Sequence, residues 1–324
     1  MILIASCEFD VSAKKIIDLC EYKKIPYFYI ENSHIVTIDD VEIINGELKN
    51  FSINNISTNK IIFQEEISGF FYRKGRLIPD INLDFFSNVD NDTKQNFFYT
   101  LNNDFNTLVE FIFRWIEHNV HSIGSYINIV PNKLQMLQIA SECGLEVPDS
   151  YIFSDLSKTK IFKKNKNYIC KSIQQILSFI NNDYLFATYA SKFQKSDKHK
   201  NEYRLFPSLI QQKINSHYEI RCFFFYNHIY NIAILHNKNK SRYVDYRAVE
   251  NIETVPFIFN KTQEKKVKNF IAKSVYNSGS IDFLLSEQEE LFFLEINPVG
   301  QFDFVSDFCG KNIEIDIINY LSKH

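Results

Sequence analysis

Glycine is scarce in this sequence, which has 8 glycines among 324 residues, and none of them forms a GxGxxG or GxxxxGK pattern. Those patterns bring backbone N–H groups against phosphates in dinucleotide-binding folds and in P-loop proteins. The sequence therefore excludes the usual glycine-rich phosphate loops. A nucleotide bound by this chain would have to be held in another way.

Cysteine and histidine are also few and lack the spacing of metal ligands. The 6 cysteines are scattered without a CxxC pair, and several lie in apolar stretches, as small hydrophobic side chains do. The 8 histidines form no HxxxH pair and no evident triad with Ser or Cys. This distribution predicts neither a zinc site nor a disulfide scaffold, and nothing in it points to a nucleophilic hydrolase.

Long apolar runs and an excess of one charge are absent as well. No run approaches the roughly 20 apolar residues that cross a bilayer, and Glu8 and Asp10 follow the first strand-like run where a secretory signal would stay apolar. We therefore expect a cytoplasmic protein without a membrane partner. The net charge of -3 provides no general attraction for phosphate backbones, so we expect no nucleic acid partner either.

Large apolar side chains are abundant, with 31 Phe and 18 Tyr in a chain that is 45% hydrophobic. A buried core is easily built from this composition, and the length favours two or three compact units. We place the units at residues 1–128, 129–206 and 207–324, with a mixed α/β and α+β architecture throughout.

The first unit begins with a strand, helix, strand order, which predicts a small α/β domain with a parallel sheet. Short strands separated by Asn, Asp and Gly then suggest an inserted hairpin or meander, and a long amphipathic helix closes the unit. The expected elements are a strand at 1–6, a helix capped by Ser12, a strand at 27–30, the insertion at 35–62, a strand at 70–73 and a helix at 93–118.

The remaining two units alternate short helices with β-rich stretches. Asn132 is expected to cap a helix that ends at Gly144, and the polar stretch 190–204 is interpreted as an exposed loop. The other expected elements are strands at 151–153, 167–172, 209–214, 219–225 and 229–235, a helix at 262–276, a hairpin of 280–285 with 291–297, and a final helix at 313–321.

The last hairpin carries the strongest chemical pattern. Antiparallel pairing about the turn at 286–290 would place Asp282 beside Glu295, and residues two apart in a strand share a face, so Glu295 and Asn297 point the same way. Oxygen ligands of this kind suit Mg²⁺ bound together with substrate phosphates better than zinc. The alternative is that the three side chains are a solvated polar face of the hairpin.

Further positively charged positions add to this pattern. Glu219 and Arg221 would share one strand face, where Arg221 can meet phosphate oxygens or simply form an ion pair. Lys171 lies in an otherwise apolar strand and needs an anionic partner, either a carboxylate or a nucleotide phosphate. The charged turns at 73–76 and 245–247 either bind substrate or are solvated surface.

Read in order, these segments resemble the ATP-grasp family over residues 130–310. The segments are Asn132–Leu137, Gly144–Pro148, Lys171, Gln211–Ile214, Glu219–Arg221, Gly279–Asp282 and Glu295–Pro298. Phe71–Arg73, Val244–Arg247 and Asn297–Phe302 are most similar to its peptide-modifying branch, the microviridin-type graspetide synthetases, also called grasp-with-spasm maturases.

The resemblance implies an ATP-grasp fold preceded by an N-terminal α/β pre-ATP-grasp domain, with ATP and Mg²⁺ as cofactors. It assigns Arg221 and Lys171 as catalytic cations and Asp282, Glu295 and Asn297 as metal ligands. Arg73, Asp245 and Arg247 become candidates for peptide contacts. The implied ATP-binding residues are Lys133, Lys171, Gln211, Gln212, Ile214 and Glu219.

The sequence departs from the family pattern at two places beside the expected hinge. The segment Asn215–Tyr218 lacks a Lys that related ligases usually carry there, and Gln212 occupies a position that is often Glu. A glutamine carbonyl still accepts a hydrogen bond from an amino group.

The reaction implied by the resemblance is ATP-dependent activation of Asp or Glu side chains of a ribosomal precursor peptide as acyl phosphates. Ser, Thr or Lys side chains of the same peptide would then close macrocyclic esters or amides. One alternative is a carboxylate-amine ligase for a free amino acid, a dipeptide or a protein tail. Another is a nucleotide-binding module without turnover, against which the complete Arg221, Asp282, Glu295 and Asn297 set argues. The assembly is open, with a homodimer as one possibility.

Overall fold

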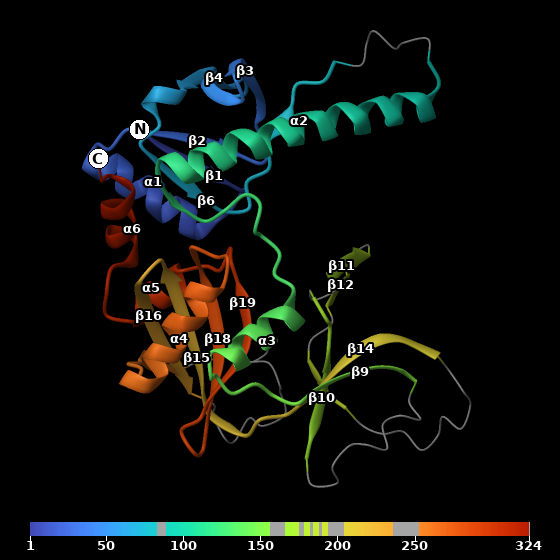
Figure 1. Ribbon diagram of the computed structural model, residues 1–324, viewed down its shortest axis with the longest axis vertical. Coiled ribbons are helices and arrows are strands. Elements are labelled where there is room, and N and C mark those ends of the chain that lie inside the picture. Colours follow the sequence, from blue (N-terminus) through green and yellow to red (C-terminus); the bar gives the residue numbers. More distant parts are fainter. Residues whose placement is uncertain are drawn as a thin grey trace.

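The computed structural model describes residues 1–82, 89–155, 166–174, 178–181, 184–187, 190–193, 204–235 and 253–323 (Figure 1). The expected Asp245 and Arg247 lie outside the described residues. Among the helices of this described part, none is long and apolar enough to cross a bilayer.

The N-terminal region is built on a four-stranded sheet in the order β2-β1-β6-β8, and every pairing in it is parallel. The predicted strand, helix, strand order is confirmed, because the first helix connects the two neighbouring strands β1 and β2. The elements are β1 (Ile2–Ser6), α1 (Val11–Lys23), β2 (Tyr27–Glu31), β6 (Gly69–Tyr72) and β8 (His121–Ile123).

The N-cap of α1 differs from the prediction. Asp10 caps the helix, since its carboxylate accepts a hydrogen bond from the Ala13 backbone N–H at 2.9 Å. Ser12 instead lies in the first turn, and its hydroxyl donates to Asp303 at 2.5 Å. Both residue types are favoured at N-caps, so the sequence alone did not separate them.

The predicted insertion forms a second sheet in the order β5-β4-β3-β7. The long helix α2 (Asn91–Asn119) follows it and extends beyond the parallel sheet at one end (Figure 1). Val109, Ile112 and Phe113 of α2 pack with Leu3 and Phe70 on one face of the parallel sheet. The insertion elements are β3 (Ile35–Ile44), β4 (Glu47–Asn55), β5 (Lys60–Phe63), η1 (Gln64–Glu66) and β7 (Ile78–Pro79).

The central region is an antiparallel sheet in the order β13-β10-β14-β9, with the hairpin of β11 and β12 beside it. The helix α3 (Lys133–Glu142) precedes this sheet, and its predicted cap Asn132 is confirmed by contacts to the N–H groups of Leu134 and Gln135. The strands are β9 (Ser150–Asp155), β10 (Tyr168–Lys171), β11 (Ser178–Asn181), β12 (Tyr184–Ala187), β13 (Ser191–Lys192) and β14 (Arg204–Gln212). The stretch 190–204, expected as a loop, thus holds β13 and the first residue of β14.

The C-terminal region is a five-stranded antiparallel sheet in the order β17-β16-β15-β18-β19. The predicted hairpin is confirmed as β18 paired with β19. The elements are β15 (Ser216–Phe225), β16 (His228–Leu235), β17 (Glu253–Pro256), α4 (Lys261–Lys273), β18 (Ser278–Ser286), β19 (Leu291–Asn297), α5 (Asp303–Phe308) and α6 (Ile313–Leu321).

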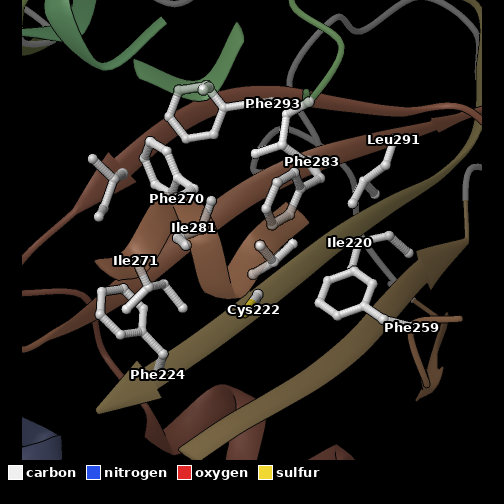
Figure 2. Packing of buried hydrophobic residues seen from close by; sticks show 14 of the residues in the cluster. Ile220, Cys222, Phe224, Phe259, Phe270, Ile271, Ile281, Phe283, Leu291 and Phe293 are labelled. Atoms are coloured by element: carbon white, nitrogen blue, oxygen red, sulfur yellow. The ribbon is translucent and has the colours of Figure 1, made fainter. Parts of the chain in front are cut away.

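One face of this sheet is covered by α3 and α4. Figure 2 shows Phe270 of α4 close to Phe293 and Ile281 of the strands. The ring centroids of Phe270 and Phe293 lie 4.8 Å apart. Phe283 is fully buried in the same cluster. The site residues described below therefore extend from a rigid aromatic and aliphatic core.

Replacement of Phe283 by Ala is expected to lower the free energy of unfolding by about 3–5 kcal/mol, because it leaves a large cavity in this core. The side chain contacts the rings of Phe259 and Phe293. Urea unfolding would measure the loss. Tyr22→Ala is the matched control, since Tyr22 is 85% exposed and its removal should change stability by no more than about 0.5 kcal/mol.

The last helix returns to the N-terminal sheet. Ile317 and Leu321 of α6 pack in one cluster with Ile4 and Phe71, and the Leu321 carbonyl oxygen lies 2.4 Å from where a side chain at Gly69 would begin. Only glycine permits this approach at position 69. The chain segments 1–128 and 207–324, predicted as separate units, thus share a hydrophobic cluster, and the unit boundaries stay predictions.

Candidate active site

A row of charged side chains crosses three adjacent strands of the C-terminal sheet. Arg221 in β15 is opposite Asp282 in β18, and Asp282 is opposite Glu295 in β19. Directly opposed residues in antiparallel strands have side chains on the same face. The predicted juxtaposition of Asp282 and Glu295 is therefore confirmed, while their role as metal ligands stays a prediction.

Arg221 holds the carboxylates on its own side of the row. Its Nε atom lies 3.0 Å from Asp282 Oδ1, and its Nη2 donates to Asp282 Oδ2 at 3.2 Å. The Glu219 carboxylate lies 3.7 Å from Nη2, as expected for residues that share a strand face. Arg221 and Asp282 keep only 17% and 15% of their side-chain surface exposed, so their interaction is weakly screened by solvent.

The N-terminus of α3 supplies a cation on the other side of the row. Lys133 Nζ forms an ion pair of 2.8 Å with Glu295 Oε2. Because the Asn132 cap fixes the first turn of α3, and α3 packs on the face of the sheet, Lys133 is held close to the end of β19. The family resemblance assigns Lys133 to ATP binding and does not predict this contact with Glu295, a candidate metal ligand.

Lys171, at the end of β10, belongs electrostatically to the same site. Burial lowers the pKa of Lys171 below its ordinary value, and Lys133 acts in the same direction, while Glu295 and Asp282 partly offset both effects. A lysine whose pKa depends on these groups lies within electrostatic range of them. The charges of Lys133, Asp282 and Glu295 thus act on a buried lysine of the central sheet.

The candidate ligand Asn297 ends β19 and is exposed. Its side-chain oxygen accepts a hydrogen bond from the Val299 N–H at 3.2 Å, and the Gly300 N–H donates to its carbonyl at 2.9 Å. The sequence Asn297–Gly300 thus forms a compact turn beside the carboxylate row.

The predicted hinge residues differ in burial and in their hydrogen bonds. Gln211 is 1% exposed and donates from its side-chain amide to Ser150 Oγ at 2.9 Å, which makes it a support of the hinge. The Gln212 side-chain oxygen accepts from Lys166 Nζ at 2.7 Å, and Ile214 is buried two residues further on. Gln212 is thus less buried than Gln211, and its side-chain oxygen is bonded to Lys166.

Lys166 lies beside the hinge and is not among the site residues that the sequence predicts. It forms an ion pair of 2.7 Å with Asp149, and this interaction raises the pKa of Lys166. The register Tyr168↔Gln212 brings it to the hinge. No local sequence signal distinguishes it from the other lysines near it in the sequence.

Arg73 does not lie where a peptide contact was expected. Its side chain is 5% exposed and is bonded to Asp10 and to the Gly300 carbonyl. The Arg73 guanidinium is thus buried and hydrogen-bonded within the protein, and it is not accessible from solvent. Its position therefore favours a structural or positioning role over direct contact with a peptide.

The donor set fits Mg²⁺ by its chemistry. Asp282, Glu295 and Asn297 provide hard oxygen atoms, and Mg²⁺ is commonly bound by one or two carboxylates while substrate phosphates and waters complete its shell. Among the residues that the structure describes, no three His, Cys, Asp or Glu side chains gather into a ready-made metal cage. The arrangement therefore suits a metal that arrives with a nucleotide.

Comparisons with solved structures identify the fold. No family model matches the sequence, and no curated protein matches it. The structure is similar to macrocyclase MdnC bound with precursor peptide MdnA from Microcystis aeruginosa, with 19% identity, a TM-score of 0.75 and 99% coverage of both chains. It is also similar to a RiPP-associated ATP-grasp ligase of Chryseobacterium gregarium in complex with ADP and a leader and core peptide, with 17% identity and a TM-score of 0.77 over 99% of this chain and 96% of that one.

A more distant similarity connects the chain to a small-molecule ligase. The D-alanine–D-alanine ligase of Bacillus anthracis matches with 13% identity and a TM-score of 0.52 over 99% of this chain and 96% of that one. The fold class expected from the sequence is confirmed by these similarities: the chain has the ATP-grasp fold, preceded by an N-terminal α/β domain.

Proposed function

We propose that this protein is an ATP-dependent ligase that forms macrocyclic esters or amides in a ribosomal precursor peptide. The observation that carries the proposal is the row Arg221, Asp282, Glu295 and Lys133. It lies on a fold shared over almost the whole chain with a macrocyclase solved with a precursor peptide and an ATP-grasp ligase solved with a leader and core peptide. A cytoplasmic location follows from the use of ATP and a newly made peptide.

The chain's residues would divide the work as follows. Lys171 and Arg221 would neutralise phosphoryl oxygens of ATP, and Asp282, Glu295 and Asn297 would hold Mg²⁺, which supplies further neutralisation of phosphate charge when bound. Lys133, Gln212 and Glu219 would orient the nucleotide, with Gln211 and Ile214 supporting the hinge. Asp245 and Arg247 remain candidates for peptide contacts.

The proposed chemistry needs no protein nucleophile. A carboxylate oxygen of the peptide attacks the γ-phosphorus, ADP departs, and an acyl phosphate forms. A hydroxyl oxygen or an amine nitrogen of the same peptide then attacks the acyl carbon and loses its proton, while the acyl C–O bond breaks and inorganic phosphate departs. The cations of the site meet the main physical demand, which is to stabilise negative charge on the transferring group.

Mass spectrometry of short peptides rich in Ser, Thr, Asp and Glu, especially one encoded beside this gene, tests the proposal. After incubation with the protein, Mg²⁺ and ATP, we expect the peptide mass to fall by one water for each ring formed. The loss should require ATP. Intact peptides with continued ATP consumption would instead favour a ligase for free amino acids, as the similarity to D-alanine–D-alanine ligase allows.

A further inference from the structure

A buried ion pair lies between the N-terminal sheet and the metal-ligand candidates. Arg73 follows β6, and its Nε donates to both oxygens of Asp10, at 3.1 and 3.0 Å. The two side chains keep only 5% and 3% of their surface exposed. Asp10 in turn caps α1 through the Ala13 N–H. The guanidinium is therefore fixed by a carboxylate that is itself fixed by a helix.

Arg73 extends from this pair to the turn that follows β19. Its Nη1 donates to the Gly300 carbonyl at 2.6 Å. The turn has little room to shift toward β18, because a side chain at position 300 would begin 2.3 Å from the Ser280 hydroxyl oxygen. Gly300 is also bonded through its N–H to the carbonyl of Asn297. A restraint on the Gly300 carbonyl is therefore a restraint on Asn297.

The beginning of α1 holds the same C-terminal segment at two further points. The Ser12 hydroxyl donates to Asp303, and Lys15 Nζ lies 2.7 Å from Asp307. The Lys15–Asp307 pair is exposed and joins α1 to α5, away from the turn at 297–300. It joins the same two parts of the molecule without touching the metal-ligand candidates, and so provides a natural control.

Stability is a poor explanation for the buried pair. Buried ion pairs often contribute no more than apolar residues of similar volume, because each charge loses its hydration. Within the described part of the chain, Arg73 Nη2 is in addition buried without a hydrogen-bond acceptor, which is unfavourable for folding. Phe9, next to Asp10, has a φ of 60°, which is unfavourable for a bulky side chain. Buried unpaired donors and strained backbone conformations are typically found at functional positions.

We propose that Asp10 and Arg73 are positioning residues for the metal-binding end of β19. Arg73, oriented by Asp10, fixes the Gly300 carbonyl and thereby the turn from which Asn297 presents its side-chain oxygen. The inference rests on the proposed Mg²⁺-nucleotide site, which it extends to the N-terminal domain. Outer partners that orient metal ligands typically change metal affinity about 10- to 100-fold when they are removed.

The test uses the double variant Asp10→Asn/Arg73→Met. Asn preserves an N-cap for α1, and Met fills much of the arginine's volume, so no unpaired charge is buried and the fold should be retained. Mn²⁺ binding in the presence of the non-hydrolysable β,γ-imido analogue of ATP is followed by electron paramagnetic resonance. We expect Mn²⁺ to bind at least about 10-fold more weakly than to the wild-type protein. Thermal unfolding of each variant verifies that the fold is intact.

Lys15→Ala is the control and should bind Mn²⁺ as the wild-type protein does. Equal Mn²⁺ affinity in the double variant and the wild-type protein would overturn the positioning role while leaving the proposed ligase untouched. Equal weakening in Lys15→Ala would reassign the effect to general docking of the two parts and would also overturn it. Absence of nucleotide-dependent Mn²⁺ binding in the wild-type protein would remove the metal site itself, and with it both proposals.

Discussion

Glu295→Gln is expected to raise the activation free energy of ATP-dependent turnover by at least about 2 kcal/mol, the scale of losing one electrostatic stabiliser. The substitution preserves the shape of the side chain and removes its charge. It replaces one carboxylate oxygen beside Asp282 by an amide NH₂ group and removes the anion that pairs with Lys133. The charge balance of the site is thus altered together with its affinity for a cation.

Steady-state ATP turnover at saturating peptide, with Mg²⁺ varied, measures this effect. If Glu295 binds the metal, raising the Mg²⁺ concentration should recover part of the lost rate. Glu264→Gln is the matched control, because Glu264 pairs with Lys268 on the exposed surface of α4 and should leave turnover unchanged. Near-normal turnover by Glu295→Gln would remove that residue from the metal role.

The hairpin and its charged row were predictable because both depend on local rules. Two apolar stretches separated by a short polar turn predict antiparallel pairing, and a side-chain period of two then decides which residues share a face. Asp282 and Glu295 follow directly from that register. The same reasoning placed Glu219 beside Arg221, and the 3.7 Å contact agrees with it.

Contacts between residues far apart in the sequence could not be predicted, because they form only when distant segments pack together. The Asp10–Arg73 pair joins residues 63 positions apart, and Arg73 reaches Gly300 across 227 positions. A basic turn in the sequence carries no sign that its arginine will be buried, and the burial follows only when the segment after β19 packs on α1. The sequence pattern alone therefore allows either a substrate contact or solvated surface for Arg73, and only the family resemblance makes it a candidate for a peptide contact.

The short helix α5 was also missed, because it spans only Asp303–Phe308 and has no side-chain cap. Its six residues are too few for a recognisable helical period. Lys166 was missed for the opposite reason, since many lysines surround it. Its distinction comes from strand pairing, which brings it to Asp149 and Gln212.

Arg221→Met is expected to have the second large effect, a loss of turnover of about 10²- to 10³-fold. The substitution removes the positive charge from the β15 end of the row and leaves Asp282 and Glu219 without the cation that pairs with both. Like charges brought together in a partly buried site also destabilise the fold, so we expect stability to fall by about 1–3 kcal/mol, less than for a fully buried pair.

Arg221→Lys should restore little of the activity. The guanidinium contacts Asp282 through both Nε and Nη2, whereas an ammonium group is a single point charge that cannot preserve both contacts. ATP turnover and urea unfolding, measured on the same preparations, separate the two roles. Arg114→Met, which breaks an exposed pair with Glu110 on α2, controls for the loss of an arginine. If turnover falls no more than the fraction of folded protein does, Arg221 is a structural ion-pair partner. If Arg221→Lys is fully stable and yet loses turnover, the reaction requires the bidentate guanidinium.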